Sequence, residues 1–282
     1  MRPDPIMKKI LLFLLGLFFV PMALAANKER VITLGGSVTE IVYELGLGER
    51  LIADDLSSLY PEAATRLPRV GYYRAVPVEG VVAMHPDLIL ASENAGPAQA
   101  LESISKLGIE IVKVSDRSSL ESMYERVQQI AKVLSAEDKG DALIKKIRAE
   151  VAQAQALPGK NLKTVLIVNR TGTFQAAGSH TAASALISLA GLTNVLESTQ
   201  KGYKPVSAES LVNFGPELII VTEGSVQASG GLDKFLKHPA IATTPAAINN
   251  RIVVMDDLLA LGLGPRVAQA IEQLKLASNA TQ

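Results

Sequence analysis

The middle of the chain, residues 121–161, reads ESMYERVQQIAKVLSAEDKGDALIKKIRAEVAQAQALPGKN. It is rich in helix formers, and no proline interrupts it before Pro158. Its apolar residues recur at helical spacing, in Met123, Val127, Ile130 and Leu134 and then in Leu143, Ile147 and Val151. Residues 136–157 alone would span about 33 Å at ~1.5 Å per residue. This pattern predicts a spacer helix between two lobes. The alternative is an ordinary pair of surface helices within one domain.

An internal repeat indicates what lies on either side of this helix. GYYRAVPVEGVVAMHPDLIL, residues 71–90, aligns with GYKPVSAESLVNFGPELII, residues 202–220, after a one-residue gap. Each half contains a glycine turn, a helix, a Gly-Tyr loop, a short helix and a buried strand, which is the alternation typical of α/β folds. We therefore predict two Rossmann-like lobes with parallel sheets. The chain then divides into an N-terminal lobe (residues 26–135), a spacer helix (136–157) and a C-terminal lobe (158–282).

The first residues have the features of an export signal. Two lysines precede an apolar run at residues 10–20, and the small residues ALA follow at 23–25. We predict a signal peptide over residues 1–25, cleaved near Ala25, and a location in the periplasm. The run is short for a bilayer span, which argues against the alternative, a membrane anchor. The chain has no cysteine, so we expect no disulfide and no lipid-bearing cysteine after the signal.

Composition and motifs argue against several classes of function. The 28 basic and 28 acidic residues give a formal net charge of zero, without the basic excess of a nucleic-acid-binding protein. The sequence has no G-x-S-x-G or H-E-x-x-H motif, and its three histidines, His85, His180 and His238, are not at metal-ligand spacing. We predict a protein that is not an enzyme and has no nucleic-acid partner. The alternative from a different class is a secreted enzyme on a two-lobed scaffold.

A glycine turn follows the first predicted strand, in VITLGGSVTEIVYELGLGERL, residues 31–51. Ser37, with Glu40 three residues later, has the pattern of a capping box, so we expect the two to cap the following helix. The turn could also hold an anion at the helix N-terminus, although G-G-S is far from a full phosphate-binding fingerprint.

Two adjacent tyrosines occupy a proline-broken segment, LPRVGYYRAVP, residues 67–77, in a chain with only six tyrosines and no tryptophan. Such a phenol can simply pack over an apolar edge, but a deprotonated phenol is also a ligand of ferric iron. Arg74 stands two residues beyond Tyr72, on the same side of an extended segment, and could supply the positive charge that favours the phenolate. One tyrosine would then bind a ligand while the other packs.

Several stretches distributed over the mature chain carry a resemblance, and they are VITLGGSVTEIVYELGLGERL, SSLYP, LPRVGYYRAVPVEGVVAMHPDLIL, AGP around Gly96, GYKPVSAESLV and LGLGPR. Together they resemble the periplasmic haem-binding proteins of bacterial haem ABC importers. The resemblance implies a class III periplasmic binding protein, with ferric haem b as the transported ligand. It also implies that the tyrosine of the V-G-Y-x-R loop, here Tyr72, is the axial ligand of the haem iron, and that Arg74 hydrogen-bonds its phenolate. Tyr73 stands where relatives often have leucine, methionine or glutamine, so which tyrosine ligates the iron stays open.

A haem site also needs apolar walls and cations for the propionates. LLALGLGPR, residues 258–266, is expected to line the cleft from the second lobe. Loop cations that could meet the propionates are Arg69, Lys201, Lys204 and Arg170. His180 and Tyr203 are second-lobe candidates for contact with the ligand.

The resemblance implies a partner, an inner-membrane permease with its cytoplasmic ATPase. Glu79 and Glu209 occupy equivalent positions of the repeat, each near the start of a short helix beside a Gly-Tyr loop, and we expect them to dock onto that permease. We expect the protein itself to be a monomer. Cobalamin or a ferric siderophore is the alternative ligand for the same architecture, although the V-G-Y-x-R pattern favours haem.

Overall fold

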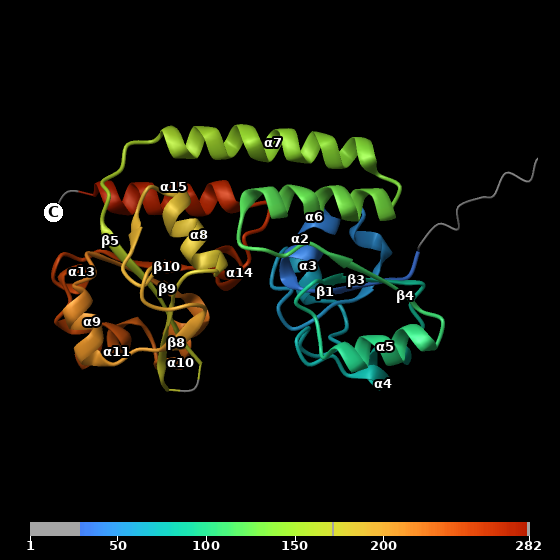
Figure 1. Ribbon diagram of the computed structural model, residues 1–282, viewed down its shortest axis with the longest axis horizontal. Coiled ribbons are helices and arrows are strands. Elements are labelled where there is room, and N and C mark those ends of the chain that lie inside the picture. The colour runs from blue at the N-terminus through green and yellow to red at the C-terminus, as the bar shows by residue number, and fades with distance from the viewer. Residues whose placement is uncertain (1–28, 171, 281–282) are drawn as a thin grey trace, which may run out of the picture.

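The computed structural model describes residues 29–170 and 172–280, so the predicted signal peptide, residues 1–25, lies outside the described residues. Within those two ranges, no helix is both long and apolar enough to cross a membrane. The described chain forms two lobes, each built on its own sheet, and one long helix, α7 (Glu137–Ala156), lies across both (Figure 1). The predicted two-lobed α/β architecture is therefore confirmed.

The sheet of the N-terminal lobe is parallel throughout, in the order β2-β1-β3-β4. Its strands are β1 (Val31–Leu34), β2 (Leu51–Ala53), β3 (Leu88–Ser92) and β4 (Glu110–Val114). Its helices are α2 (Gly36–Glu44), α3 (Glu62–Thr65), α4 (Val78–Val82), α5 (Ala98–Lys106) and α6 (Leu120–Val133). Because side chains alternate along a strand, Leu88 and Leu90 pack in one cluster with α2 and α6, whereas Ile89 packs in another with α4 and α5. Helices on both faces explain why β3 is buried along its whole length.

The sheet of the C-terminal lobe has the order β10-β9-β5-β6-β8, with β7 also paired to β5. Its strands are β5 (Lys163–Asn169), β6 (Phe174–Ala177), β7 (Thr193–Asn194), β8 (Tyr203–Pro205), β9 (Leu218–Thr222) and β10 (Ile252–Met255). Strands β5, β7, β9 and β10 run parallel, but β6 pairs antiparallel with both β5 and β8. This edge departs from a purely parallel sheet because the connection between β5 and β6 is too short for a crossover.

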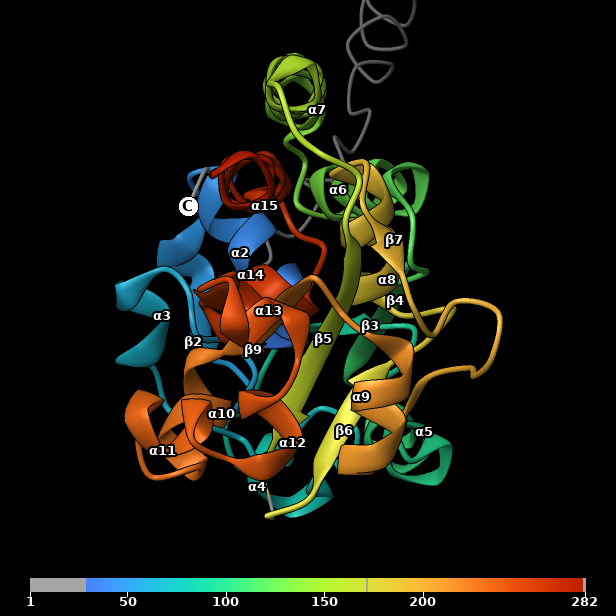
Figure 2. The same cartoon turned by 90° about the vertical axis from the view of Figure 1, so that its left-hand side faces the viewer.

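Two groups of helices complete the C-terminal lobe. They are α8 (Ala182–Leu189), α9 (Ala208–Phe214), α10 (Glu223–Ala228), α11 (Leu232–Leu236), α12 (Pro239–Ala242), α13 (Pro245–Ile248), α14 (Asp257–Leu261) and α15 (Val267–Asn279). The helices α8, α14 and α15 pack in the same apolar cluster as α7, and α9 to α13 pack in a separate cluster. The helix α15 lies directly beside α7 (Figures 1 and 2).

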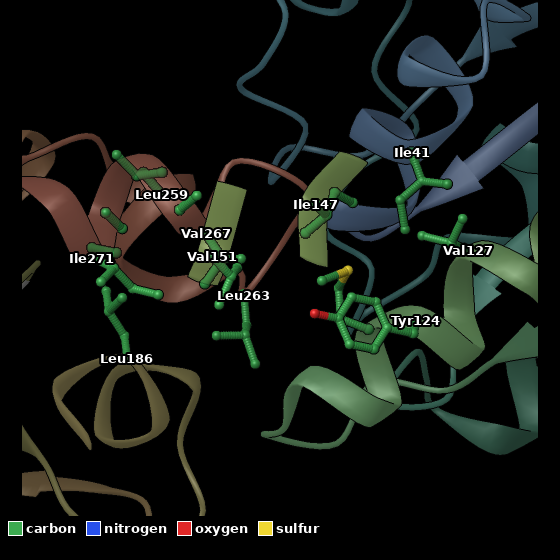
Figure 3. Packing of buried hydrophobic residues seen from close by; sticks show 14 of the residues in the cluster. Ile41, Tyr124, Val127, Ile147, Val151, Leu186, Leu259, Leu263, Val267 and Ile271 are labelled. Carbon is green, nitrogen blue, oxygen red and sulfur yellow. The ribbon is translucent and has the colours of Figure 1, made fainter. Parts of the chain in front are cut away.

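The spacer helix forms almost as predicted, over Glu137–Ala156 instead of residues 136–157. It packs against α6 of the N-terminal lobe and α15 of the C-terminal lobe. Figure 3 shows its Ile147 and Val151 between side chains of both lobes, and all of these belong to one buried apolar cluster. The two lobes therefore share a continuous core beneath α7. The predicted points of division, residues 135 and 158, stay a prediction.

The prediction of a capping box at the start of α2 is wrong. The N-cap is Gly35, which makes no side-chain cap, and Ser37 lies inside the first turn. Glu40 is 1 % exposed and accepts a hydrogen bond from Nε of Arg266, just before α15, at 3.0 Å. The guanidinium of Arg266 also contacts Asp256 at 3.3 Å and lies 3.6 Å from the ring centre of Tyr60. Burial raises the pKa of Glu40, and the charge of Arg266 opposes that rise. Glu40 thus joins the two lobes instead of capping its own helix.

This inter-lobe pair leads to a prediction about stability. Arg266→Lys keeps the charge but loses the planar guanidinium that bonds Glu40 and stacks on Tyr60. We expect the free energy of unfolding to fall by about 1–2 kcal/mol, as for the loss of one charged hydrogen bond. Urea unfolding measures it. Arg66→Lys, at a surface pair with Glu62, is the matched control and should be nearly neutral; equal losses would show that Arg266 has no special part in joining the lobes.

Candidate functional site

A large cleft of about 1910 Å³ lies between the lobes. This exceeds the ~300–1,000 Å³ of common small-molecule sites. The N-terminal lobe lines the cleft with the glycine turn 35–37, the loop after β2, the tyrosine loop (residues 71–75) and the loops after β3 and β4. The C-terminal lobe lines it with the start of α8, the start of β8 and the segments after β9 and β10. Most of these segments follow the carboxyl ends of parallel strands, where α/β sheets hold their ligands.

The tyrosine loop presents both phenol rings to the cleft. Tyr72 is 38 % exposed, and its ring lies edge-on to that of Tyr73 with 5.0 Å between the ring centres. Arg74 donates a hydrogen bond from Nε to the hydroxyl of Tyr73 at 2.9 Å, and its guanidinium lies 5.1 Å from the centre of that ring. The structure thus pairs the cation with Tyr73, where we expected Tyr72.

The backbone explains this correction. The expectation assumed an extended segment, in which residues 72 and 74 face the same side. Instead the loop turns back on itself, because the N–H of Ala75 donates to the carbonyl oxygen of Tyr72 at 2.8 Å. Gly71 begins the loop with a φ of 101°, a conformation that favours glycine. The turn brings Arg74 beside its immediate neighbour.

Two phenols of the cleft hold their protons firmly. Burial raises the pKa of Tyr73 to about 12, although the charge of Arg74 acts against the rise. Desolvation likewise raises the pKa of Tyr203, which opens β8 on the opposite lobe, and Arg170 acts against that rise. Both residues are therefore neutral at pH 7 unless a cation displaces the proton.

The C-terminal lobe brings several predicted residues to the cleft. His180 stands just before α8 with a φ of 59°, and its Nδ1 lies 3.2 Å from the hydroxyl of Ser179. Arg170, Lys201 and Tyr203 also line the cleft. Their presence there makes contact with a ligand sterically possible, and their roles stay a prediction.

Two predicted cations do not line the cleft. Lys204 follows Tyr203 in β8, and the alternation of side chains along a strand turns it away. Nη1 of Arg69 donates to the carbonyl oxygens of Asp55 and Ser58, at 2.6 and 2.9 Å, and pairs with the carboxylate of Asp54 at 3.0 Å. Arg69 is thus engaged in holding the loop after β2, and contact of either cation with a propionate stays a prediction.

Apolar and charged groups that the sequence analysis did not single out complete the walls. Leu56 and Leu59, 57 % and 44 % exposed, line the cleft from the N-terminal lobe, and Leu258, Leu261 and Leu263 of the predicted stretch 258–266 line it from the C-terminal lobe. Six of the charged and polar groups that sequence reasoning missed are Glu93, Asn94, Asp116, Arg117, Glu223 and Asp257. A usable signal existed, because all of them closely follow the strands β3, β4, β9 and β10. Among residues 29–170 and 172–280, no three His, Asp or Glu side chains gather as a metal site.

The two glutamates expected to dock lie outside the cleft lining. Glu79 and Glu209 are both exposed, in the first turns of α4 and α9. Both helices lie on the side of the molecule away from α7 (Figures 1 and 2). The structure thus places one exposed carboxylate on each lobe on this side, and their contact with a permease stays a prediction.

Comparisons with known proteins agree with this geometry. The family model described as "Periplasmic binding protein" matches residues 31–259. The solved structure of the periplasmic heme-binding protein RhuT from Roseiflexus sp. RS-1 is 33% identical, covers 89% of this chain and 97% of its own, and superposes with a TM-score of 0.84. The heme-binding protein BhuT, solved in complex with two hemes, is 33% identical with coverages of 88% and 98% and a TM-score of 0.81.

A curated relative carries a different ligand in its name. The vitamin B12-binding protein of Vibrio vulnificus strain CMCP6 is 30% identical over 95% of this chain and 96% of its own length. The relatives thus differ in the ligands that they are named for. The chain belongs to the periplasmic binding protein family, the substrate-binding class of ABC importers.

Proposed function

We propose that this protein captures ferric haem in the cleft between its lobes, through a tyrosine ligand, and delivers it in the periplasm to an inner-membrane ABC permease. The observation that carries the proposal is the phenol pair with its guanidinium on one wall of the cleft. The match to a family described as periplasmic binding proteins supports a role in binding. The 33% identity with heme-binding RhuT and BhuT adds support.

The chemistry of the tyrosine loop suits a ferric ion inside a flat apolar ring. A phenolate oxygen is a hard ligand of ferric iron in haem proteins. Tyr72 is the more exposed phenol and carries no hydrogen bond from Arg74, so we assign it as the axial ligand. Tyr73, bonded to Arg74 and with a pKa of about 12, packs beside it as a neutral phenol. The leucines on both walls would cover the porphyrin faces, and Arg170 and Lys201 are the remaining predicted cations at the cleft.

Cobalamin is the second candidate, because a B12-binding relative is 30% identical over nearly the whole chain. The two ligands separate in one experiment. Hemin added to the purified mature protein should give a Soret band and a charge-transfer band toward the red, the pattern of tyrosinate-bound ferric haem. Tight binding of cyanocobalamin with an unperturbed hemin spectrum would overturn the haem assignment.

The charge of Arg74 leads to a prediction about pH. Iron can bind only when a phenol gives up its proton, so the affinity for hemin should fall as the pH falls. The guanidinium of Arg74 lies in the tyrosine loop, where a positive charge favours a phenolate, so its removal raises the energy of the ligating state. Arg74→Ala should displace the curve of hemin affinity against pH by about one unit to higher pH, or about tenfold in affinity at fixed pH.

The matched control for this displacement is Lys204→Ala, which removes one positive charge that points away from the cleft. Its curve should coincide with that of the unmodified protein. An unmoved curve for Arg74→Ala would show that the cation does not assist ligation.

A further inference from the structure

The loop after β2 contains a fully buried carboxylate with an unusual number of bonds. Asp55 is 0 % exposed and accepts five hydrogen bonds. Its Oδ1 receives the N–H of Gly35 at 3.0 Å and the hydroxyls of Ser57 and Ser58 at 2.8 and 3.2 Å. Its Oδ2 receives the N–H of Ser57 at 3.1 Å and the N–H of Tyr73 at 3.0 Å. An ionised carboxylate offers about four lone-pair positions, so its accepting capacity is filled.

These bonds join three segments that line the cleft. Gly35 belongs to the glycine turn before α2, Ser57 to the loop after β2, and Tyr73 to the tyrosine loop. The N–H of Tyr73 stands in the backbone between the two phenol rings. The bond from this N–H to Asp55 therefore sets the position of the backbone that carries both rings.

A second anchor holds the other side of the tyrosine loop. The N–H of Gly96 donates to the carbonyl oxygen of Tyr73 at 2.9 Å, and the N–H of Val76 donates to the carbonyl oxygen of Gly96 at 2.8 Å. The N–H of Leu56 also donates to the carbonyl oxygen of Gly71, at 2.8 Å. Asp55 supplies the side-chain anchor among these contacts, and it acts on the residue between Tyr72 and Arg74.

The neighbouring Asp54 provides a contrast within the same loop. It is also 0 % exposed, but its carboxylate pairs with Arg69 and makes no bond to the tyrosine loop. The two adjacent carboxylates thus have equal burial and different partners. One stabilises the loop through a cation, and the other connects the loop to the phenol pair.

We propose that Asp55 is the positioning residue of the iron site, which holds the Tyr72–Tyr73 backbone where a phenolate can ligate; this role rests on the proposed function. Metal ligation needs the ligand oxygen placed within a few tenths of an ångström. A loop residue reaches such precision only when surrounding hydrogen bonds fix it. Asp55 does so without touching the ligand, from a carboxylate buried behind the cleft surface.

The substitution Asp55→Asn tests the role because it preserves size and changes the acceptors. An amide has a single oxygen, and its NH₂ group can only donate. The NH₂ group of the new amide would therefore point at a backbone N–H that needs an acceptor. Either the bond from Gly35 or the bond from Tyr73 would be lost. Asp54→Asn makes the same chemical change one residue earlier, away from the tyrosine loop, and is the matched control.

Two readouts distinguish positioning from general stability. In the ligand-free protein, amide hydrogen exchange at Tyr73 should become at least tenfold faster in Asp55→Asn and change less than twofold in Asp54→Asn. In hemin titrations, Asp55→Asn should bind at least tenfold more weakly with a shifted charge-transfer band, while Asp54→Asn keeps the band in place. Should Asp55→Asn fail to fold, Asp55→Glu carries the test, since it keeps the charge but displaces both oxygens by one methylene and should shift the same band.

The outcomes separate this role from the proposed function. If the unmodified protein shows no tyrosinate spectrum with hemin, the proposed function is overturned, and the role of Asp55 in ligation with it. If the unmodified protein and Asp55→Asn, or Asp55→Glu in its place, give the same spectrum and affinity, the role of Asp55 alone is overturned. Equal effects of the changes at Asp54 and Asp55 also overturn it, because they would reflect loop stability.

Discussion

Replacing Tyr72 by alanine is expected to abolish the tyrosinate–iron band and to weaken hemin binding at least about a hundredfold, or ~2.7 kcal/mol. Tyr72 is the phenol of the tyrosine loop that is exposed in the cleft and free of a bond from Arg74. Its removal leaves Tyr73, which is half-buried and has a pKa of about 12. Visible spectra and a hemin titration of the purified variant measure both effects.

Tyr73→Phe is the matched control for this prediction. It keeps the ring that packs edge-on against Tyr72 and removes only the hydroxyl bonded to Arg74. The spectrum should remain close to that of the unmodified protein. Because the structure pairs Arg74 with Tyr73, this control is also the sharpest test of the assignment. Loss of the band in Tyr73→Phe, with the band retained in Tyr72→Ala, would identify Tyr73 as the ligand.

The double variant Glu79→Ala with Glu209→Ala is expected to bind hemin normally and to lose stimulation of transport. Each carboxylate is exposed in the first turn of a short helix, where the helix dipole favours it without a buried partner. One lies on each lobe, on the side away from α7 (Figure 1). Two such charges suit basic patches on a permease of two subunits. ATPase activity and haem uptake in vesicles reconstituted with the permease should fall to the level seen without this protein.

Salt and a second double variant control for nonspecific charge effects. Exposed charges act mainly by steering and orienting association, so added salt should weaken stimulation by the unmodified protein. Glu137→Ala with Glu272→Ala removes two exposed carboxylates from α7 and α15 and should leave transport intact. Full transport by the Glu79 and Glu209 double variant would contradict a docking role for these residues.

The sequence predicted those features of the fold that depend on local patterns. The apolar spacing from Leu143 to Val151 is a property of one helix, and it predicted α7 to within one residue at each end. The repeat predicted two sheet-based lobes because both halves of the chain show the same order of helix and strand patterns. The role of Glu40 was predicted wrongly, because its partner Arg266 is 226 residues away and no local pattern includes both residues. The antiparallel β6 was missed because the repeat covers only part of each lobe.

The sequence allowed us to predict which residues line the cleft better than which hydrogen bonds they form. Tyr72, Tyr73, Arg74, His180 and Tyr203 all line the cleft, and the Gly-Tyr repeat had pointed to both tyrosine-bearing loops. The bond of Arg74 to Tyr73 could not be foreseen, because it depends on a turn closed by a backbone hydrogen bond. The pairing of Arg69 with Asp54 could not be foreseen either, because a loop arginine carries no sequence mark of its buried partner, and the same holds for the bonds of Asp55.

The single crossing by α7 has a consequence for how a transporter would tell a loaded protein from an empty one. One helix over a shared core, reinforced by Glu40 and Arg266, leaves little freedom for the lobes to swing together. A large closing movement is then unavailable as a signal of loading. If Glu79 and Glu209 dock as predicted, the permease has to sense a local difference at the mouth of the cleft, such as an occupied gap between the lobes. In such a protein the ligand in the cleft, and not a change in the overall shape, distinguishes the loaded state from the empty one.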